Sequence, residues 1–195
     1  MLPLRGKILN VANASSQKLS QNQLLSDLIQ ALGAGTGTRY RDEDLRYERV
    51  IIMTDADVDG AHIASLLITF FFQEMPELIE QGHLFLAMPP LYKLAHGAKS
   101  FYARDDRHKD ELIKREFPAN AKVEISRFKG LGEMNAAQLK ETTMDASKRT
   151  LLQVSAIADE KAAVTEAVNA LMGSKPEARF RFIQEHAAFA KDLDI

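Results

Sequence analysis

The sequence predicts an α/β fold in which a parallel sheet is flanked by helices. Three consecutive segments carry this prediction: an apolar, β-branched run at residues 50–53, a nearly continuous apolar helical pattern over 61–81, and another apolar run at 83–88. Strand, helix and strand in this order form a βαβ crossover, and the handedness rule for such units places the two strands parallel. Because the helix is apolar nearly all round, we expect it to be buried.

The composition narrows the class of protein. With 195 residues, 46% of them hydrophobic, the chain can bury one large or two small domains. The absence of cysteine excludes disulfides and thiolate metal sites and favours hard oxygen ligands, which suit Mg²⁺. A formal charge of −2 argues against a uniformly basic DNA-binding surface, so any nucleic-acid contact must be local. No signal peptide or membrane-spanning run is present, which predicts a cytoplasmic protein without a membrane partner.

The segment before the first strand is expected to be a loop followed by a helix. Pro3 and Gly6 favour an irregular start, and an apolar stripe predicts a helix over residues 20–32 that ends at Gly33. The glycine-rich run at 33–37 lacks the Lys-Ser/Thr ending of a phosphate-binding P-loop. We therefore interpret it as a helix C-cap and turn.

The segment after the first strand should contain further helices and strands. Pro76 is expected to kink or divide the long helix, and Gly82 to end it. A hairpin is predicted beyond Pro90, with strands at 91–94 and 100–103. The remaining predicted elements are a surface helix at 104–116, a strand at 122–128, a turn at 129–133 that opens a helix, a strand at 150–154, and helices at 159–171 and 177–193.

Three carboxylates follow the first strand at alternate positions. Asp55, Asp57 and Asp59 stand immediately before Gly60, at the carboxyl end of a strand, which is where open α/β sheets bind ligands. Like charges this close raise one another's pKa unless a cation neutralises them. The motif therefore predicts a cation site formed by these three residues.

Several other interpretations fit part of this motif. In a purely structural one, Asp59 is a helix N-cap and the other two acids are solvated. A calcium EF-hand is excluded, because the twelfth position of the loop is Leu66 and a strand precedes it. An aspartyl-phosphate phosphatase fits the local Asp-x-Asp pattern, although the chain has no Gly-Asp dipeptide to complete the magnesium site. A phosphodiester site with one or two Mg²⁺ ions also fits, with His62 one helical turn away as a donor or as a structural residue.

Four ordered motifs resemble those of a known family. The segment Thr54-Asp55-Ala-Asp57-Val-Asp59-Gly60-Ala-His62-Ile63 is similar to the second acidic motif of the Toprim fold in bacterial type IIA DNA topoisomerases. The motifs at residues 3–11, 88–93 and 127–134 resemble signatures of the B subunits of these enzymes, in the same order. Because the segment between Tyr92 and Arg127 is short, the resemblance favours the B subunit of topoisomerase IV over that of gyrase.

The resemblance implies a domain division and a set of site residues. It implies a Toprim domain (Rossmann-like, with a parallel sheet) at residues 1–98 that lacks its first strand and acidic motif, and a mostly helical α+β tail domain at 99–195. Asp55 and Asp57 match the catalytic magnesium ligands, and Asp59 matches a supporting metal ligand. The DNA contacts that it implies are Arg5, Lys7, Asn10, His62 and Arg179.

The resemblance also implies partners. In this family a tyrosine of the A subunit attacks double-stranded DNA in an ATP-dependent A2B2 complex, and one or two Mg²⁺ ions of the Toprim domain assist cleavage and religation. The Glu-Gly-Asp-Ser-Ala motif and the ATP-binding domain would lie before residue 1, so we expect a C-terminal fragment that is inactive alone. It would act in the cytoplasm, associated with the nucleoid. The alternative from another class is a non-catalytic docking module for DNA and the A subunit.

Overall fold

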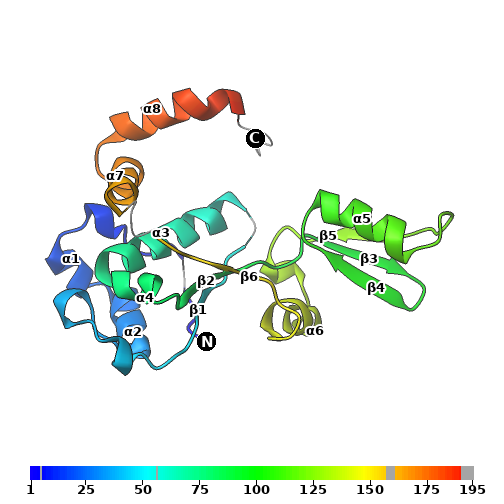
Figure 1. The fold of residues 1–195 in the computed structure, drawn as a ribbon, viewed down its shortest axis with the longest axis horizontal. Coiled ribbons are helices and arrows are strands. Elements are labelled where there is room, and N and C mark those ends of the chain that lie inside the picture. The colour runs from blue at the N-terminus through cyan, green and yellow to red at the C-terminus, as the bar shows by residue number, and fades with distance from the viewer. Residues whose placement is uncertain (5, 56, 157–160, 190–195) are drawn as a thin grey trace. The chain divides into compact units, whose positions relative to one another are not determined.

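The computed structural model describes residues 1–4, 6–55, 57–156 and 161–189 and divides into two compact units (Figure 1). The first unit comprises Met1–Glu48, Leu66–Gly82 and Ser155–Ile195, and the second comprises Arg49–Ser65 and His83–Val154. One of the boundaries between the two units, at Ser65 and Leu66, falls within a helix, α3 (Val58–Glu74). The bounds of these units differ from the predicted domain division at residue 98. That division into domains at 1–98 and 99–195 stays a prediction.

The first unit is helical. Besides the later part of α3, its elements are η1 (Val11–Asn13), α1 (Ser16–Ser20), α2 (Gln23–Leu32), η2 (Gly37–Arg39), η3 (Asp42–Asp44), α4 (Pro76–Glu80), α7 (Lys161–Met172), α8 (Pro176–His186) and η7 (Ala187–Phe189). The predicted helix at 20–32 starts later than expected, because Asn22 caps α2 by accepting the N–H of Leu25 at 3.1 Å. Gly33 ends α2 in the left-handed conformation, as predicted (φ 81°).

The long apolar helix is divided at Pro76, as the sequence predicts. Proline cannot donate the hydrogen bond that would continue α3, and it stands instead at the first position of α4. The fully buried side chains of this stretch include Phe70, Phe71 and Met75. The expectation that the helix is buried is therefore confirmed from Leu66 onward, whereas Ala61, His62 and Ser65 in its first turns are exposed. Within the described residues, no helix has the length and apolar character needed to cross a bilayer.

The first sheet of the second unit contains the predicted parallel pair. Strand β1 (Val50–Ile52) pairs in parallel with β2 (Leu84–Ala87), with Ile51 opposite Phe85. A third strand, β6 (Leu151–Gln153), joins the far side of β2 in the antiparallel sense. The predicted α/β class and the crossover are confirmed, and the strand predicted at 150–154 completes the sheet.

A second sheet has the order β4-β3-β5 and is antiparallel throughout. Its strands are β3 (Tyr92–His96), β4 (Lys99–Ala103) and β5 (Glu124–Arg127), which confirms the predicted hairpin and the strand that follows the surface helix. Helix α5 (Asp106–Glu116) packs against it through Leu112, in a core with Leu94 and Phe117. The chain continues through η4 (Leu131–Glu133), α6 (Ala136–Leu139) and a π-helical turn, η5 (Lys140–Met144).

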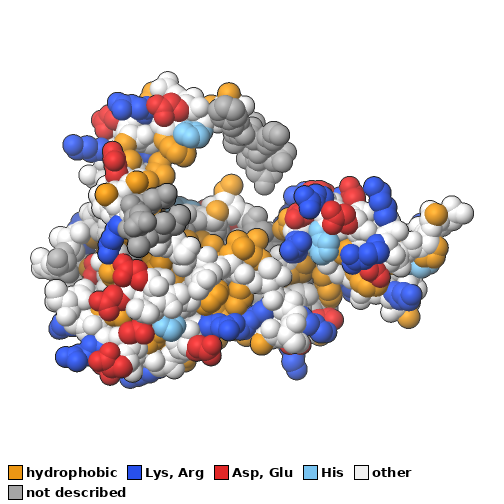
Figure 2. Space-filling model, viewed as in Figure 1, with side chains coloured by type: hydrophobic (Ala, Val, Ile, Leu, Met, Phe, Trp, Pro, Cys, Tyr) orange, Lys and Arg blue, Asp and Glu red, His pale blue; other side chains and the backbone are white. Residues whose placement is uncertain are grey.

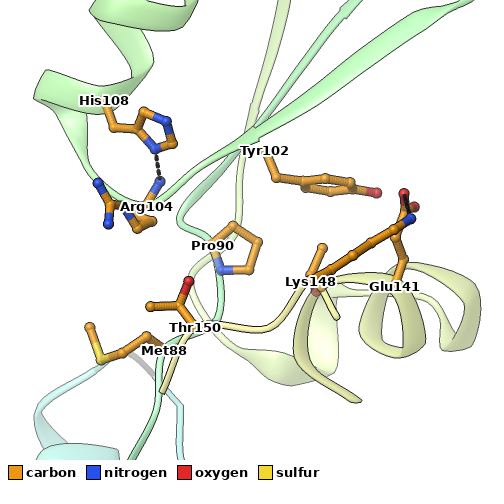
Figure 3. A pocket seen from close by; sticks show the side chains of 9 residues that line it. Met88, Pro90, Tyr102, Arg104, His108, Glu141, Lys148 and Thr150 are labelled. Atoms are coloured by element: carbon orange, nitrogen blue, oxygen red, sulfur yellow. Dashed lines mark hydrogen bonds and ion pairs between the residues drawn. The ribbon is translucent and has the colours of Figure 1, made fainter. Parts of the chain in front are cut away.

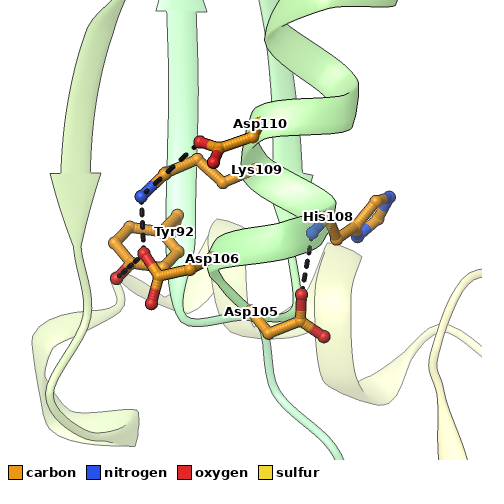
Figure 4. A network of polar contacts seen from close by, with 6 residues as sticks. All are labelled: Tyr92, Asp105, Asp106, His108, Lys109 and Asp110. Carbon is orange, nitrogen blue, oxygen red and sulfur yellow. Dashed lines mark hydrogen bonds and ion pairs between the residues drawn. The ribbon is translucent and has the colours of Figure 1, made fainter.

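A polar network joins α5 to β3 (Figure 4). The Tyr92 hydroxyl donates to Asp106 Oδ1 at 2.9 Å, and Lys109 Nζ donates to the same oxygen at 2.5 Å. The hydrogen bond from Lys109, followed by that from Tyr92, lowers the pKa of the Asp106 carboxyl. The acid at the start of α5 is thus neutralised by side chains of its own unit.

Candidate functional site

The acidic turn between β1 and α3 is built by a close approach of backbone to backbone. A Cβ atom at Gly60 would lie 2.1 Å from the carbonyl oxygen of Asp55, so only glycine allows the first turn of α3 to pack there. This contact folds the chain sharply as it leaves β1. It places the three carboxylates at the carboxyl end of the strand, where the sequence predicts them.

Asp57 is the capping residue of α3. Its Oδ1 accepts the N–H of Gly60 at 2.7 Å, and its backbone carbonyl accepts the N–H of Ala61 at 3.0 Å. The structural interpretation that made Asp59 the N-cap is wrong, because Asp59 already lies in the first turn of the helix. Both side chains are exposed. A carboxylate at this helix end is also favoured by the helix dipole.

Asp55 is held by a turn from far along the chain. The N–H of Leu131 donates to Asp55 Oδ1 at 2.7 Å across 76 positions of sequence. Gly130 lies beside the same carboxylate, where a Cβ atom would come within 2.8 Å of Oδ1. The sequence predicts a turn at residues 129–133 but does not show that it reaches Asp55. The only available signal was the Lys-Gly-Leu-Gly signature itself.

The donor set suits Mg²⁺ if the ion keeps some of its water. Within the described part of the chain, no group of three or more His, Cys, Asp or Glu side chains converges to hold a metal ion by itself. Magnesium is usually bound through one or two carboxylates together with water and phosphate oxygens. Asp55 and Asp57 each accept a backbone N–H at Oδ1, which leaves the second carboxylate oxygen of two exposed residues as a possible metal ligand. The two residues therefore fit such an ion, and the predicted metal set stays a prediction.

The predicted DNA contacts are distributed over both units. His62 lies in α3, three residues after Asp59, and its side chain is exposed. Lys7 is exposed in the first unit, on a segment held by the buried side chains of Ile8 and Val11. Arg5 lies outside the described residues. The DNA contacts of Lys7, His62 and Arg5 therefore stay predictions.

The side chains of Asn10 and Arg179 both donate hydrogen bonds to carbonyls at the C-terminal end of α7. Asn10 Nδ2 donates to the carbonyl of Met172 at 2.9 Å. Arg179 Nη1 donates to the carbonyls of Leu171 and Gly173. The last carbonyls of a helix have no partner within it, so these side chains satisfy them. The structure thus gives both residues a structural role that the sequence did not predict.

A separate cavity of about 410 Å³ lies in the second unit (Figure 3). Figure 3 shows Tyr102, Glu141 and Lys148 together on one side of Pro90, and Arg104 on the other. Lys148 Nζ donates to Glu141 Oε1 at 3.2 Å, so its charge is already neutralised. The other lining residues are Met88, His108, Thr142 and Thr150. The cavity does not include the carboxylates of the acidic turn.

Charged side chains are mixed over the surface. Figure 2 shows Lys and Arg interspersed with Asp and Glu on the visible face of the molecule. This agrees with the formal charge of −2 and with the expectation that a contact with nucleic acid would be local.

Comparison with known proteins gives two family matches. Residues 1–89 match the Toprim domain, and residues 120–184 match the carboxyl terminus of the DNA gyrase B subunit. Over its whole length the chain is 67% identical to the DNA topoisomerase 4 B subunit of Bartonella bacilliformis and 67% identical to that of Caulobacter vibrioides. It is 48% identical to the DNA gyrase B subunit of Halalkalibacterium halodurans. The chain spans 28%, 28% and 30% of the length of these relatives.

Proposed function

Because this chain belongs to the family of bacterial type II DNA topoisomerase B subunits, we propose that it supplies the Mg²⁺-binding part of a site that cuts and rejoins both strands of DNA. The observation that carries the proposal is the pair Asp55 and Asp57 at the end of β1. A bound Mg²⁺ would stabilise the charge that develops on phosphodiester oxygens during cleavage and religation. The higher identity to the topoisomerase 4 proteins than to the gyrase protein supports a topoisomerase IV enzyme.

The proposal gives each predicted site residue a role. Asp55 and Asp57 hold the ion through their carboxylate oxygens. Asp59, two positions after Asp57, adds negative charge to the site. Lys7 and His62 contact DNA phosphates near the cleaved bond, together with Arg5. Each would add a local, salt-dependent contribution to binding.

The proposal assigns the remaining chemistry to partners. Double-stranded DNA is the substrate, and an A subunit supplies the tyrosine nucleophile in an A2B2 assembly with one or two Mg²⁺ ions. ATP is bound outside residues 1–195. An enzyme acting on the bacterial chromosome would work in the cytoplasm at the nucleoid.

The test compares charge-removing variants that keep the fold. Asn is as good an N-cap as Asp, and its side-chain carbonyl can still accept a backbone N–H. Asp55→Asn and Asp57→Asn in the full-length B subunit should therefore fold normally. Each should lose Mn²⁺ binding measured by calorimetry and Mg²⁺-dependent DNA cleavage in the presence of the A subunit. Glu124→Gln, an exposed acid on β5, is the matched control.

The outcomes separate the alternatives. Metal binding that is unchanged in both aspartate variants, while DNA and the A subunit still bind, would show that Asp55 and Asp57 do not hold the ion and would favour the docking module. Hydrolysis of a small phosphomonoester by this protein without its partner, lost in Asp55→Asn, would identify the phosphatase instead. Loss of both metal binding and cleavage in the aspartate variants, but not in Glu124→Gln, supports the proposed site.

A further inference from the structure

The turn at residues 129–133 is anchored at both ends and closed by its own hydrogen bonds. Phe128 and Met134, on either side of it, are buried. Within the turn, Glu133 Oε2 accepts the N–H of Lys129 at 2.7 Å, and the N–H of Glu133 donates to the carbonyl of Gly130 at 3.2 Å. A turn that is anchored at both ends and closed by its own side chain can hold a neighbouring group in place.

Gly130 is needed for space and not for its backbone conformation. Its φ of −164° and ψ of 172° are extended values that any residue adopts. A Cβ atom there would lie 2.8 Å from Asp55 Oδ1 and 2.9 Å from Asp55 Cγ. Glycine thus lets the turn come into contact with this carboxylate, and the next residue, Leu131, donates its N–H to the same oxygen.

We propose that Gly130 and the backbone N–H of Leu131 position the Asp55 carboxylate for metal binding. The inference rests on the proposed function, in which Asp55 is a metal ligand, and it adds a part of the chain that no motif assigns to the metal site. An exposed aspartate otherwise samples several rotamers. The N–H holds Oδ1 and thereby fixes the direction in which the second oxygen is presented.

Such outer contacts have measurable effects on metal sites. Partners that orient a ligand typically change metal affinity by about 10-fold to 100-fold when they are removed. The contact with Leu131 also links the acidic turn to a segment 76 positions away, so the geometry of the ligand depends on how both segments fold. A change at residue 130 should therefore alter metal binding although no charged residue is replaced.

The main experiment compares alanine at two glycines of the same turn. Gly130→Ala places a Cβ against the Asp55 carboxylate, whereas Gly132 has no atom near its Cβ position. In the full-length B subunit, Gly130→Ala should weaken Mn²⁺ binding about 10-fold in calorimetry. With the A subunit, it should raise the Mg²⁺ concentration at half-maximal DNA cleavage while leaving the maximum at saturating Mg²⁺ close to wild type. Gly132→Ala should change neither value.

A second pair of variants tests the N–H itself. Leu131 is the first residue of η4, a position that proline tolerates, and the extended Gly130 before it is compatible with a following proline. Leu131→Pro removes the donor to Asp55, and Leu131→Ala keeps it while also removing most of the side chain. The proposal expects weaker Mn²⁺ binding in Leu131→Pro than in Leu131→Ala. If Gly130→Ala lowers the melting temperature, its weaker metal binding could result from lost stability. The comparison of Leu131→Pro with Leu131→Ala then decides whether the N–H positions Asp55.

The result that overturns the inference is distinct from failure of the proposed function. If Asp55→Asn abolishes Mn²⁺ binding but Gly130→Ala matches Gly132→Ala, or Leu131→Pro matches Leu131→Ala, the metal site stands and the positioning role is refuted. If Asp55→Asn leaves Mn²⁺ binding unchanged, the proposed metal site itself fails, and the positioning role fails with it.

Discussion

Two acidic segments of the second unit open a helix in the same way, one before α3 and one before α5. Asp57 Oδ1 accepts the N–H of Gly60 at 2.7 Å. Asp105 Oδ1 accepts the N–H of His108, also at 2.7 Å. In both segments one aspartate is therefore an N-cap, and capping alone does not distinguish a structural acid from a functional one.

The difference lies in the neighbouring acid. Asp106 receives hydrogen bonds from Lys109 and Tyr92, so its charge is neutralised within the unit. Asp55 receives the backbone N–H of Leu131, and it forms no ion pair with any described residue. An acid paired with a cation of its own helix stabilises the fold, whereas an acid held only by an amide keeps its charge for a ligand.

The largest expected effect is at Gly60, where the acidic turn depends on a backbone contact. Gly60→Ala would place a Cβ 2.1 Å from the carbonyl oxygen of Asp55. Because backbone atoms cannot rotate away, we expect the free energy of unfolding to fall by about 3 kcal/mol. Urea unfolding measures this change, and Gly132→Ala, with open space around it, should leave stability close to wild type. Equal stability of the two variants would contradict the close packing of the turn.

The two N-caps give the most direct comparison of the segments. Asp57→Ala and Asp105→Ala should each lower the free energy of unfolding by about 1 kcal/mol, and Asn at either position should restore most of it. DNA cleavage should distinguish the asparagine variants at the two positions. Asp57→Asn is expected to lose Mg²⁺-dependent DNA cleavage by the complete enzyme, and Asp105→Asn to keep it. Cleavage retained in Asp57→Asn would make the two segments equivalent.

Much of this difference is visible in the sequence. The segment at 105–110 contains its own cations, Arg107 and Lys109, whereas the segment at 55–59 contains none. Hydrophobic periodicity likewise predicts β1, the long helix and β2, because each buries one continuous apolar face or run. The division at Pro76 follows from a missing N–H donor, which is also a local property.

Long-range contacts could not be predicted in this way. The hydrogen bond from Leu131 to Asp55 joins residues 76 positions apart, and no pattern of spacing reports it. The pairing of β6 with β2 is of the same kind. Motif resemblance assigned Asn10 and Arg179 to DNA, but it carries no information on whether a polar group is already used by the fold.

The contacts at the end of α7 extend the comparison to the predicted DNA-binding residues. Arg179→Ala should lower the free energy of unfolding of the first unit by about 0.5 kcal/mol, because a cation near helix C-terminal carbonyls is favourable. If the guanidinium is used only by α7, the dependence of DNA affinity on salt should not change. A phosphate contact would instead reduce the slope of log affinity against log salt by about 1. His62→Ala, at an exposed position on α3, is the comparison variant and should weaken DNA binding without this loss of stability.

The smallest expected effect tests whether Asp106 belongs to the structural class. Its pKa is lowered from the usual 3.8 by Lys109 and then by Tyr92, so the unfolded chain binds the proton more tightly. The stabilisation is therefore present above the unfolded pKa and is lost as the pH falls through the lower, folded pKa. Urea unfolding between about pH 2 and pH 5 should show a shallower loss of stability in Asp106→Asn than in wild type. Because the hydrogen bond from Lys109 is the larger cause of the lowered pKa, Lys109→Met should flatten the pH dependence of stability more than Tyr92→Phe. If the slope of stability against pH is unchanged in all three variants, Asp106 belongs with the acids that are free for a ligand.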